Sequence, residues 1–157
     1  MLSLTKKTDY ALIALSYLAR RMGGVTSARE IASVSGISQP MLTNILKSLA
    51  AAGLVTSSRG SSGGYSLTKA VGEINLHEVI SIIEGPFQLI RCMHDDVSNA
   101  GQGQCELTTT CPIRQPAQRV HHRLRNFLET VTLGELFVND SSPINIPAIR
   151  RTSAAAT

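Results

Sequence analysis

Two short helix patterns joined by a glycine constrain the fold of this 157-residue chain more than any other feature. Ser27-Ala-Arg-Glu30 has the form of a capping box, in which the Ser oxygen and the Glu carboxylate satisfy backbone N–H groups at a helix start. The first helix is expected to span residues 28–35 and to end at Gly36, because glycine adopts the left-handed conformation at low cost. Ser38 can then cap a second helix. Two short helices around a tight glycine turn predict a helix-turn-helix.

The second helix separates apolar from polar side chains. One face carries Leu42, Ile45, Leu46 and Leu49. The other carries mainly amides, hydroxyls and one lysine, which are groups that bond to base edges and phosphates. An ordinary solvated face would be expected to include glutamate, yet residues 39–52 contain no acid. We therefore expect this face to contact DNA, through Ser38, Gln39, Pro40, Thr43 and Lys47.

A β-hairpin is predicted directly after these helices. Two short segments, 54–56 and 65–68, flank the run Ser-Ser-Arg-Gly-Ser-Ser-Gly-Gly, which has the composition of a hairpin turn. A hairpin in this place is a wing. Arg59 lies among small residues, so it can approach a phosphate backbone or a narrow minor groove; the alternative is a solvated loop residue. We expect Arg59, Ser61 and Tyr65 to contact DNA from the wing.

The distribution of charge along the chain also favours a DNA-binding N-terminal half. Residues 1–70 carry eight Lys and Arg against two acids, a net charge of +6, whereas residues 71–157 have a net charge of −2. A basic half joined to a mildly acidic one is typical of a nucleic-acid-binding module with an appended part. Chance placement of surface charge is the alternative.

The first apolar run, YALIALSYLA, follows two lysines but is too short to span a bilayer. Its apolar residues have the spacing of a helix that faces a core. These residues are Tyr10, Ile13, Ala14, Tyr17 and Leu18. We expect a cytoplasmic protein with no membrane segment.

Two further helices are expected in the second half. Asn75 can cap one that ends at Gly85, and Pro112 or Pro116 opens a longer one. The longer helix has an apolar seam with spacings of three and four over two heptads, which fits either a dimer interface or packing on its own core. The seam consists of Ala117, Val120, Leu124, Phe127 and Val131. Residues 132–135 can cap a short terminal turn.

The expected fold is mainly α with a small β-hairpin wing, that is, a winged helix-turn-helix plus a long C-terminal dimerisation helix. Residues 1–85 form the DNA-binding domain and residues 86–116 a cysteine loop. Residues 117–138 form the dimerisation helix and terminal turn. Residues 139–157 are rich in Ser, Pro, Ala and Thr, a composition that predicts a disordered tail.

All three cysteines, Cys92, Cys105 and Cys111, lie in one polar segment with the spacing Cys-x12-Cys-x5-Cys. In a reducing cytosol, clustered thiols favour metal binding or redox chemistry over structural crosslinking. The residues leave open an iron–sulfur cluster, a zinc site completed by His94, and a reversible disulfide. An enzyme that uses Cys92 and His94 is disfavoured, because no oxyanion donor or orienting residue is suggested. We predict no enzymatic activity.

The order of these elements resembles the winged helix-turn-helix bacterial repressors of the IscR and NsrR kind, the Rrf family, from residue 1 to about residue 137. The most specific match is the wing motif Arg59-Gly-x-x-Gly-Gly-Tyr-x-Leu67. Residues 4–12, 31–38, 49–55 and 82–85 also match. The resemblance implies a homodimer that binds a two-fold-related operator in double-stranded DNA. It also implies an iron–sulfur cluster, of the 2Fe–2S or 4Fe–4S type, that lies near the dimer helix and controls DNA affinity.

The resemblance also bears on the cluster ligands. IscR-like members have a histidine shortly after the last cysteine, where this chain has Arg114. NsrR-like members use an acid from the N-terminal helix of the other subunit, and Asp9 matches that position. The expected ligands are therefore Cys92, Cys105, Cys111 and Asp9. The signal would be nitric oxide, redox stress or iron–sulfur status.

Two departures keep alternatives open. The first two cysteines are farther apart than the family pattern, so His94, Asp95 and Glu106 remain substitute ligands. Asp9 could instead serve as a favourable charge at a helix N-terminus. A cluster-free disulfide switch or a zinc-binding repressor of the same fold is the alternative function.

Overall fold

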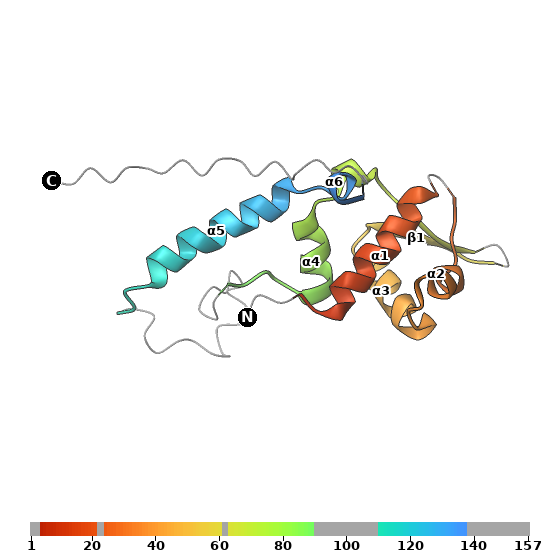
Figure 1. Cartoon of the computed structure of the whole chain (residues 1–157), viewed down its shortest axis with the longest axis horizontal. Coiled ribbons are helices and arrows are strands. Elements are labelled where there is room, and N and C mark those ends of the chain that lie inside the picture. Colours follow the sequence, from red (N-terminus) through yellow and green to blue (C-terminus); the bar gives the residue numbers. More distant parts are fainter. Residues whose placement is uncertain (1–3, 22–23, 61–62, 90–109, 138–157) are drawn as a thin grey trace.

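The computed structural model describes residues 4–21, 24–60, 63–89 and 110–137. The elements in chain order are α1 (Lys6–Arg20), α2 (Ala28–Ser35), α3 (Gln39–Ala51), β1 (Val55–Ser58), β2 (Gly64–Leu67), the 3-10 helix η1 (Val71–Glu73), α4 (Leu76–Glu84), α5 (Arg114–Thr130) and α6 (Leu133–Phe137). Helices α1 to α3 and the hairpin form one end of the molecule, and α5 extends away from them beyond α4 (Figure 1). The mainly helical fold with one antiparallel hairpin agrees with the predicted class.

The predicted helix-turn-helix is confirmed. The Ser27 hydroxyl accepts a hydrogen bond from the Glu30 N–H at 3.1 Å, and Gly36 ends α2 in the left-handed conformation with φ of 70°. The Glu30 carboxylate forms an ion pair with Arg21 at 2.5 Å rather than closing the capping box. Ser38 is the N-cap of α3 but makes no side-chain capping bond, so only its position was predicted correctly.

The core lies between α1, α2, α3, α4 and the hairpin. The four apolar residues predicted to face inward from α3 are all buried, with exposures of 4% or less. Leu15 of α1, Ile31 of α2 and Val79 of α4 are fully buried against them. This packing fixes the orientation of α3, so its polar face points outward.

The predicted inward face of α1 was partly wrong. Ile13 is 41% exposed, whereas Thr8, Ala11 and Leu15 are fully buried. Ala14 and Leu18 are buried as predicted. Because nearly every residue from 10 to 19 is apolar, spacing alone did not distinguish two neighbouring faces of this helix.

The wing is connected to the segment before α2. β1 pairs with β2 in the register Val55 with Leu67, and Tyr65 exchanges two backbone hydrogen bonds of 2.9 Å with Thr26. A Cβ atom on Gly64 would lie 2.5 Å from the Thr26 carbonyl oxygen. Gly64 therefore permits close approach of two backbones.

Replacing Gly64 with Ala is expected to lower the free energy of unfolding by about 2 kcal/mol, because the atoms in the way are backbone atoms that cannot rotate aside. Gly72→Ala is a matched control, since nothing lies within 4 Å of its Cβ position. The control should change stability by less than about 0.5 kcal/mol in urea denaturation. Equal midpoints for the two variants would contradict this account of the wing.

Backbone hydrogen bonds attach the C-terminal end of α5 to the winged domain. The Leu76 N–H donates to the Val131 carbonyl and the Leu133 N–H donates to the Ile74 carbonyl, both at 2.8 Å. Asn75 is the N-cap of α4, with its side chain accepting from the Glu78 N–H, and Gly85 is the C-cap, both as predicted. The Thr132 hydroxyl accepts from the Glu135 N–H, which confirms the cap of the terminal turn.

The long helix was also predicted correctly, although it begins at Arg114, between the two candidate prolines. Of its predicted seam, Val131 is buried, Ala117, Leu124 and Phe127 are half-buried, and Val120 is 48% exposed. Most of the seam is therefore available to another surface. The predicted tail and most of the cysteine loop lie outside the described residues, and the domain boundaries stay a prediction. Among the described residues, none of the helices is both long enough and apolar enough to span a bilayer.

Candidate functional site

The polar face of α3 presents the groups that the sequence predicted. Ser38, Gln39, Pro40 and Lys47 are exposed, and Thr43 is half-buried with its hydroxyl donating to the Gln39 carbonyl at 2.9 Å. The hydroxyl oxygen of Thr43 can still accept. The face therefore offers donors and acceptors without an acidic side chain, as a surface that enters a DNA groove requires.

One candidate DNA contact was missed in the sequence. Lys7, in the first turn of α1, lines a groove of about 400 Å³ with residues of α3 that include Ser38, Pro40 and Asn44. Its ammonium group therefore adds positive charge beside the α3 face. The paired lysines before the first apolar run were the available signal, but nothing local placed them near α3.

The wing residues differ in their surroundings. Arg59 is exposed in the loop between β1 and β2, where Gly60 has a φ of 118°. Tyr65 is half-buried and packs against the core, so its side chain has a structural role. Ser61 lies outside the described residues. DNA contact by these three residues stays a prediction.

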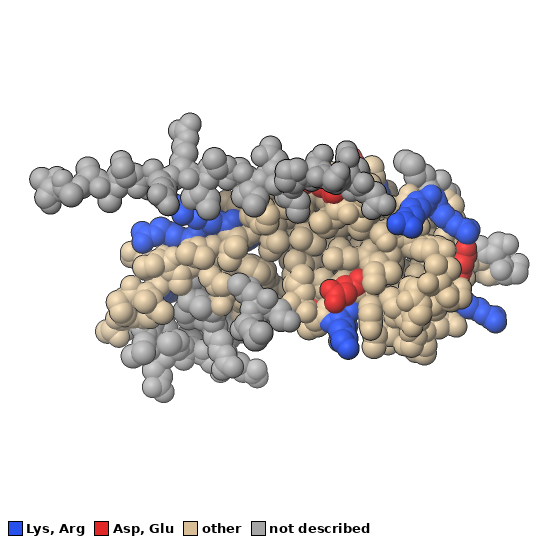
Figure 2. All heavy atoms as spheres, viewed as in Figure 1, with Lys and Arg blue, Asp and Glu red and all other residues tan. Residues whose placement is uncertain are grey.

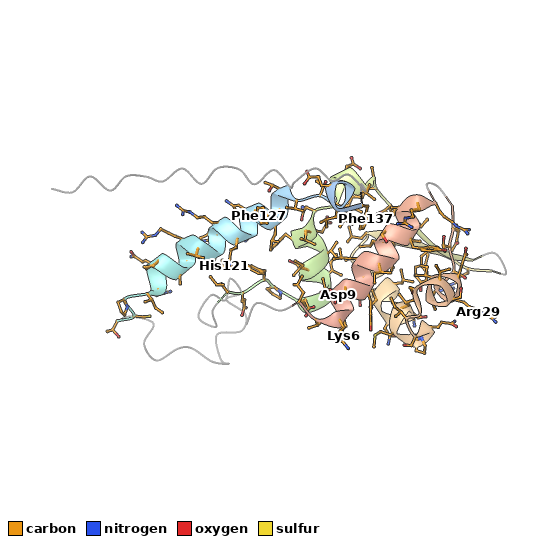
Figure 3. The ribbon with its side chains drawn as sticks, in the orientation of Figure 1. Lys6, Asp9, Arg29, His121, Phe127 and Phe137 are labelled. Carbon is orange, nitrogen blue, oxygen red and sulfur yellow. The ribbon has the colours of Figure 1, made fainter. Side chains whose placement is uncertain are left out.

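Basic side chains occur at both ends of the molecule (Figure 2). At the winged end they include Arg29, which Figure 3 places at the outer side of α2. On α5 they include Arg119 and Arg123, which are exposed.

Only one cysteine lies in the described part of the chain. Cys111 is half-buried and has a free thiol, and its carbonyl accepts from the Arg114 N–H at the start of α5. Cys92 and Cys105 lie outside the described residues. Within those residues, no group of three or more His, Cys, Asp or Glu side chains could hold a metal ion.

Asp9 is exposed in the first turn of α1 (Figure 3), and its carboxylate has no hydrogen-bond or ion-pair partner among the described residues. The start of α5 lies at one end of the molecule, whereas Asp9, in the first turn of α1, lies near its middle (Figures 1 and 3). The first turn of α1 and the start of α5 are therefore separated in the fold.

A different carboxylate caps α1, and no sequence pattern predicted it. One oxygen of Glu84, at the end of α4, accepts from the Thr5 N–H at 2.9 Å, the Thr5 hydroxyl at 2.6 Å and the Thr8 hydroxyl at 2.5 Å. We call this arrangement the Glu84–threonine contact. It satisfies an N–H at the helix start and places a negative charge there.

The contact also depends on pH. Hydrogen bonds from the Thr5 and Thr8 side chains hold the pKa of Glu84 below its ordinary value of 4.5. Because the folded-state pKa is lowered, the stabilisation is present above 4.5 and is lost as the pH falls through the lowered value. At neutral pH the carboxylate is therefore charged and the contact is formed.

Two contacts join α4 and the segment after it to α5. The Phe87 ring stacks on His121, with centroids 5.4 Å apart, and His121 is buried. Near the other end, Glu129 accepts from Arg125 at 2.8 Å and lies 3.9 Å from His77 of α4. The hydrogen bond from Arg125 is the main reason that the pKa of Glu129 is lowered. α5 is thus connected to the winged domain through α4.

Comparison with known proteins agrees with these features. The Rrf2 family model, described as an iron-dependent transcriptional regulator, matches residues 4–139. Protein aau3 of Rhizobium meliloti (strain 1021) is 31% identical over 157 residues, which cover 97% of this chain and 99% of that protein.

Two solved structures are similar over most of their length. CymR, the global cysteine regulator of B. subtilis, is 28% identical with a TM-score of 0.66, over 87% of this chain and 97% of CymR. T. potens IscR is 26% identical with a TM-score of 0.63, over 86% of this chain and 85% of IscR. The predicted resemblance is confirmed: the chain belongs to the Rrf2 family of winged-helix, DNA-binding transcriptional regulators.

Proposed function

We propose that this protein is a cytoplasmic homodimeric repressor whose affinity for a two-fold-related DNA operator is controlled by an iron–sulfur cluster. The α3 face enters the major groove, and the wing contacts the adjacent backbone or minor groove through Arg59. Each subunit reads one half-site. The half-buried seam of α5 supports this arrangement, because it leaves apolar surface for a partner helix.

Lys47 is proposed to contact a phosphate. Lys47→Ala should weaken operator binding and reduce the slope of log affinity against log salt by about one unit. Arg59→Ala should weaken binding as well. Fluorescence anisotropy with the operator at several salt concentrations measures both effects.

Lys69→Ala is the matched control, because it also removes one positive charge, but Lys69 is paired with Glu78 at 2.9 Å. Its salt slope should equal that of the parent. If Lys47→Ala and Arg59→Ala both bind like the parent at every salt concentration, the proposed DNA surface is wrong.

The cluster would be held by the thiolates of Cys92, Cys105 and Cys111 and by the carboxylate of Asp9 from the other subunit. Thiolates are the usual ligands of iron–sulfur clusters. When bound, such a cluster would supply iron that can bind small reactive molecules and can be oxidised or reduced. The chain would contribute ligands next to two helices: Cys111 lies three residues before α5, and Asp9 lies in the first turn of α1.

The carboxylate of Asp9, which is exposed and has no partner among the described residues, is the observation that carries this proposal. As a helix-capping charge, Asp9 would be one of two acids at the start of α1, and Glu84 already accepts three hydrogen bonds there. Asp9 is exposed and lies away from the start of α5 in its own chain (Figures 1 and 3). These features suit a ligand that reaches a partner subunit.

Asp9→Ala tests the assignment. The variant should keep the fold and the dimer, but its cluster should be lost faster and its visible absorption spectrum should change after anaerobic reconstitution. Asp9→Cys supplies a thiolate in place of the carboxylate and should give a longer-lived cluster than Asp9→Ala. If Asp9→Ala keeps the parental spectrum and cluster lifetime, Asp9 is not a ligand and His94 is the next residue to change.

A thiol switch is the second candidate function, favoured by the similarity to CymR and by the free thiol of Cys111. The same three cysteines would then form a reversible disulfide, or would bind zinc with His94. Anaerobic purification separates these functions from the first. A brown protein with visible absorption supports the cluster, and a colourless protein whose DNA affinity responds to dithiol reagents supports the switch.

A further inference from the structure

We propose that Glu84 is a positioning residue for the cluster site, which fixes the first turn of α1 so that Asp9 is presented to the partner subunit. This inference rests on the proposed function, because it takes Asp9 to be a ligand. It assigns to Glu84 a role in the lifetime of the cluster and not only in the stability of the fold.

The geometry of the Glu84–threonine contact supports this role. Thr5 is the N-cap of α1, and Thr8 is fully buried in the first turn of that helix. A single oxygen of the Glu84 carboxylate accepts from the Thr5 hydroxyl, the Thr8 hydroxyl and the Thr5 N–H. It therefore holds the N-cap residue and the first turn of α1 together. The Asp9 N–H donates to the Thr5 carbonyl at 3.4 Å, which makes Asp9 part of the same turn.

The first turn of a helix frays readily, because its N–H groups have no partners within the helix. A carboxylate from another element removes that freedom. Without Glu84, the Asp9 carboxylate would sample more positions, and a ligand that must be ordered on binding is a weaker ligand. Partners that orient metal ligands affect metal affinity for this reason.

The same segment also contacts the long helix. Glu84 and Phe87 line a groove of about 430 Å³ with Leu4, Leu124 and Phe127, and Phe87 stacks on His121. The segment 84–87 therefore touches both the turn that carries Asp9 and the helix that follows Cys111. In a dimer, each subunit would use this segment to couple its own α5 to the Asp9 that it gives to its partner.

The experiment compares Glu84→Ala and Thr8→Val with the parent after anaerobic reconstitution. Thr8→Val keeps the shape of the buried side chain while it removes a hydroxyl donor. We expect the cluster of Glu84→Ala to be lost about tenfold faster than the parental cluster. Thr8→Val should change the lifetime in the same direction by a smaller factor.

A double-mutant cycle separates positioning from general stability. If Glu84 acts through Asp9, Glu84→Ala should have no further effect on cluster lifetime in an Asp9→Ala background. The amide of Asp9 should also exchange hydrogen faster in cluster-free Glu84→Ala than in the cluster-free parent, and this readout needs no cluster.

Glu73→Ala is the matched control. Its carboxylate also accepts from a backbone N–H, that of Ala70 at 3.1 Å, but it caps η1 and not α1. The control should leave cluster lifetime unchanged. If Glu84→Ala does not fold, Thr8→Val decides the question in its place.

The outcomes separate the two proposals. If Asp9→Ala leaves the cluster unaffected, the ligand assignment fails, and the role of Glu84 fails with it. If Asp9→Ala shortens the lifetime but Glu84→Ala and Thr8→Val do not, Asp9 is a ligand and Glu84 does not position it. Additive effects in the double variant would also overturn the positioning role.

Discussion

Replacing Leu124 with Asp is expected to convert the proposed dimer into a monomer and to weaken operator binding roughly 100-fold or more, because two linked half-sites would no longer bind together. Leu124 is half-buried on α5, where it lines a groove with Phe127 and Leu128. A partner helix over this seam would leave the new carboxylate without water and without a cation. Analytical ultracentrifugation measures the oligomeric state, and anisotropy measures the affinity.

Asn126→Asp is the control for this experiment. It adds the same charge to the same turn of α5, but Asn126 is exposed and lies outside the seam. The control should remain dimeric. If Leu124→Asp stays a folded dimer, the seam is not the interface, and the apolar face of α5 packs elsewhere.

Changing any one of the three cysteines to alanine is expected to remove the cluster or to reduce its occupancy severely, because the proposed site has no spare thiolate. The variants are Cys92→Ala, Cys105→Ala and Cys111→Ala. All three should bind DNA like the cluster-free parent, since each gives the same empty site. Iron and sulfide analysis, visible absorption and anisotropy give the three readouts.

Thr110→Ala provides the comparison, because it changes the exposed neighbour of Cys111 and leaves the thiols in place. It should reconstitute fully. Full cluster occupancy in Cys105→Ala would show that the thiols do not form one site. Cys105 is the sharpest test, because the number of residues between Cys92 and Cys105 departs from the family pattern.

The helix-turn-helix could be predicted because its signals are local. Ser27, Gly36 and the four buried residues of α3 lie within a short stretch, and capping and spacing act over one or two turns. The hairpin was equally predictable from its glycines. The inward face of α1 was not, because a run that is apolar on every side carries little periodicity.

The Glu84–threonine contact could not be predicted, because it joins residues 79 and 76 positions apart. Nothing near Glu84 distinguishes it from any other acid at a helix end. The position of Lys7 beside α3 depends on tertiary packing in the same way. Asp9 was found through a family resemblance, and only the structure shows that its carboxylate is free within the described chain.

Because α5 is attached to the winged domain at its C-terminal end, a movement of its N-terminal end would rotate the helix about that attachment. Its 17 residues span about 25 Å, and two backbone hydrogen bonds fix its C-terminal end to the winged domain. A displacement of about 2 Å at the Cys111 end then corresponds to a rotation of about 5° at the domain, from that helix length. A change in bonding at one end would alter the angle at which two α3 helices meet the DNA. If the proposed cluster acts through α5, its effect would be a changed preference for half-site spacing, with base recognition in each half-site unchanged.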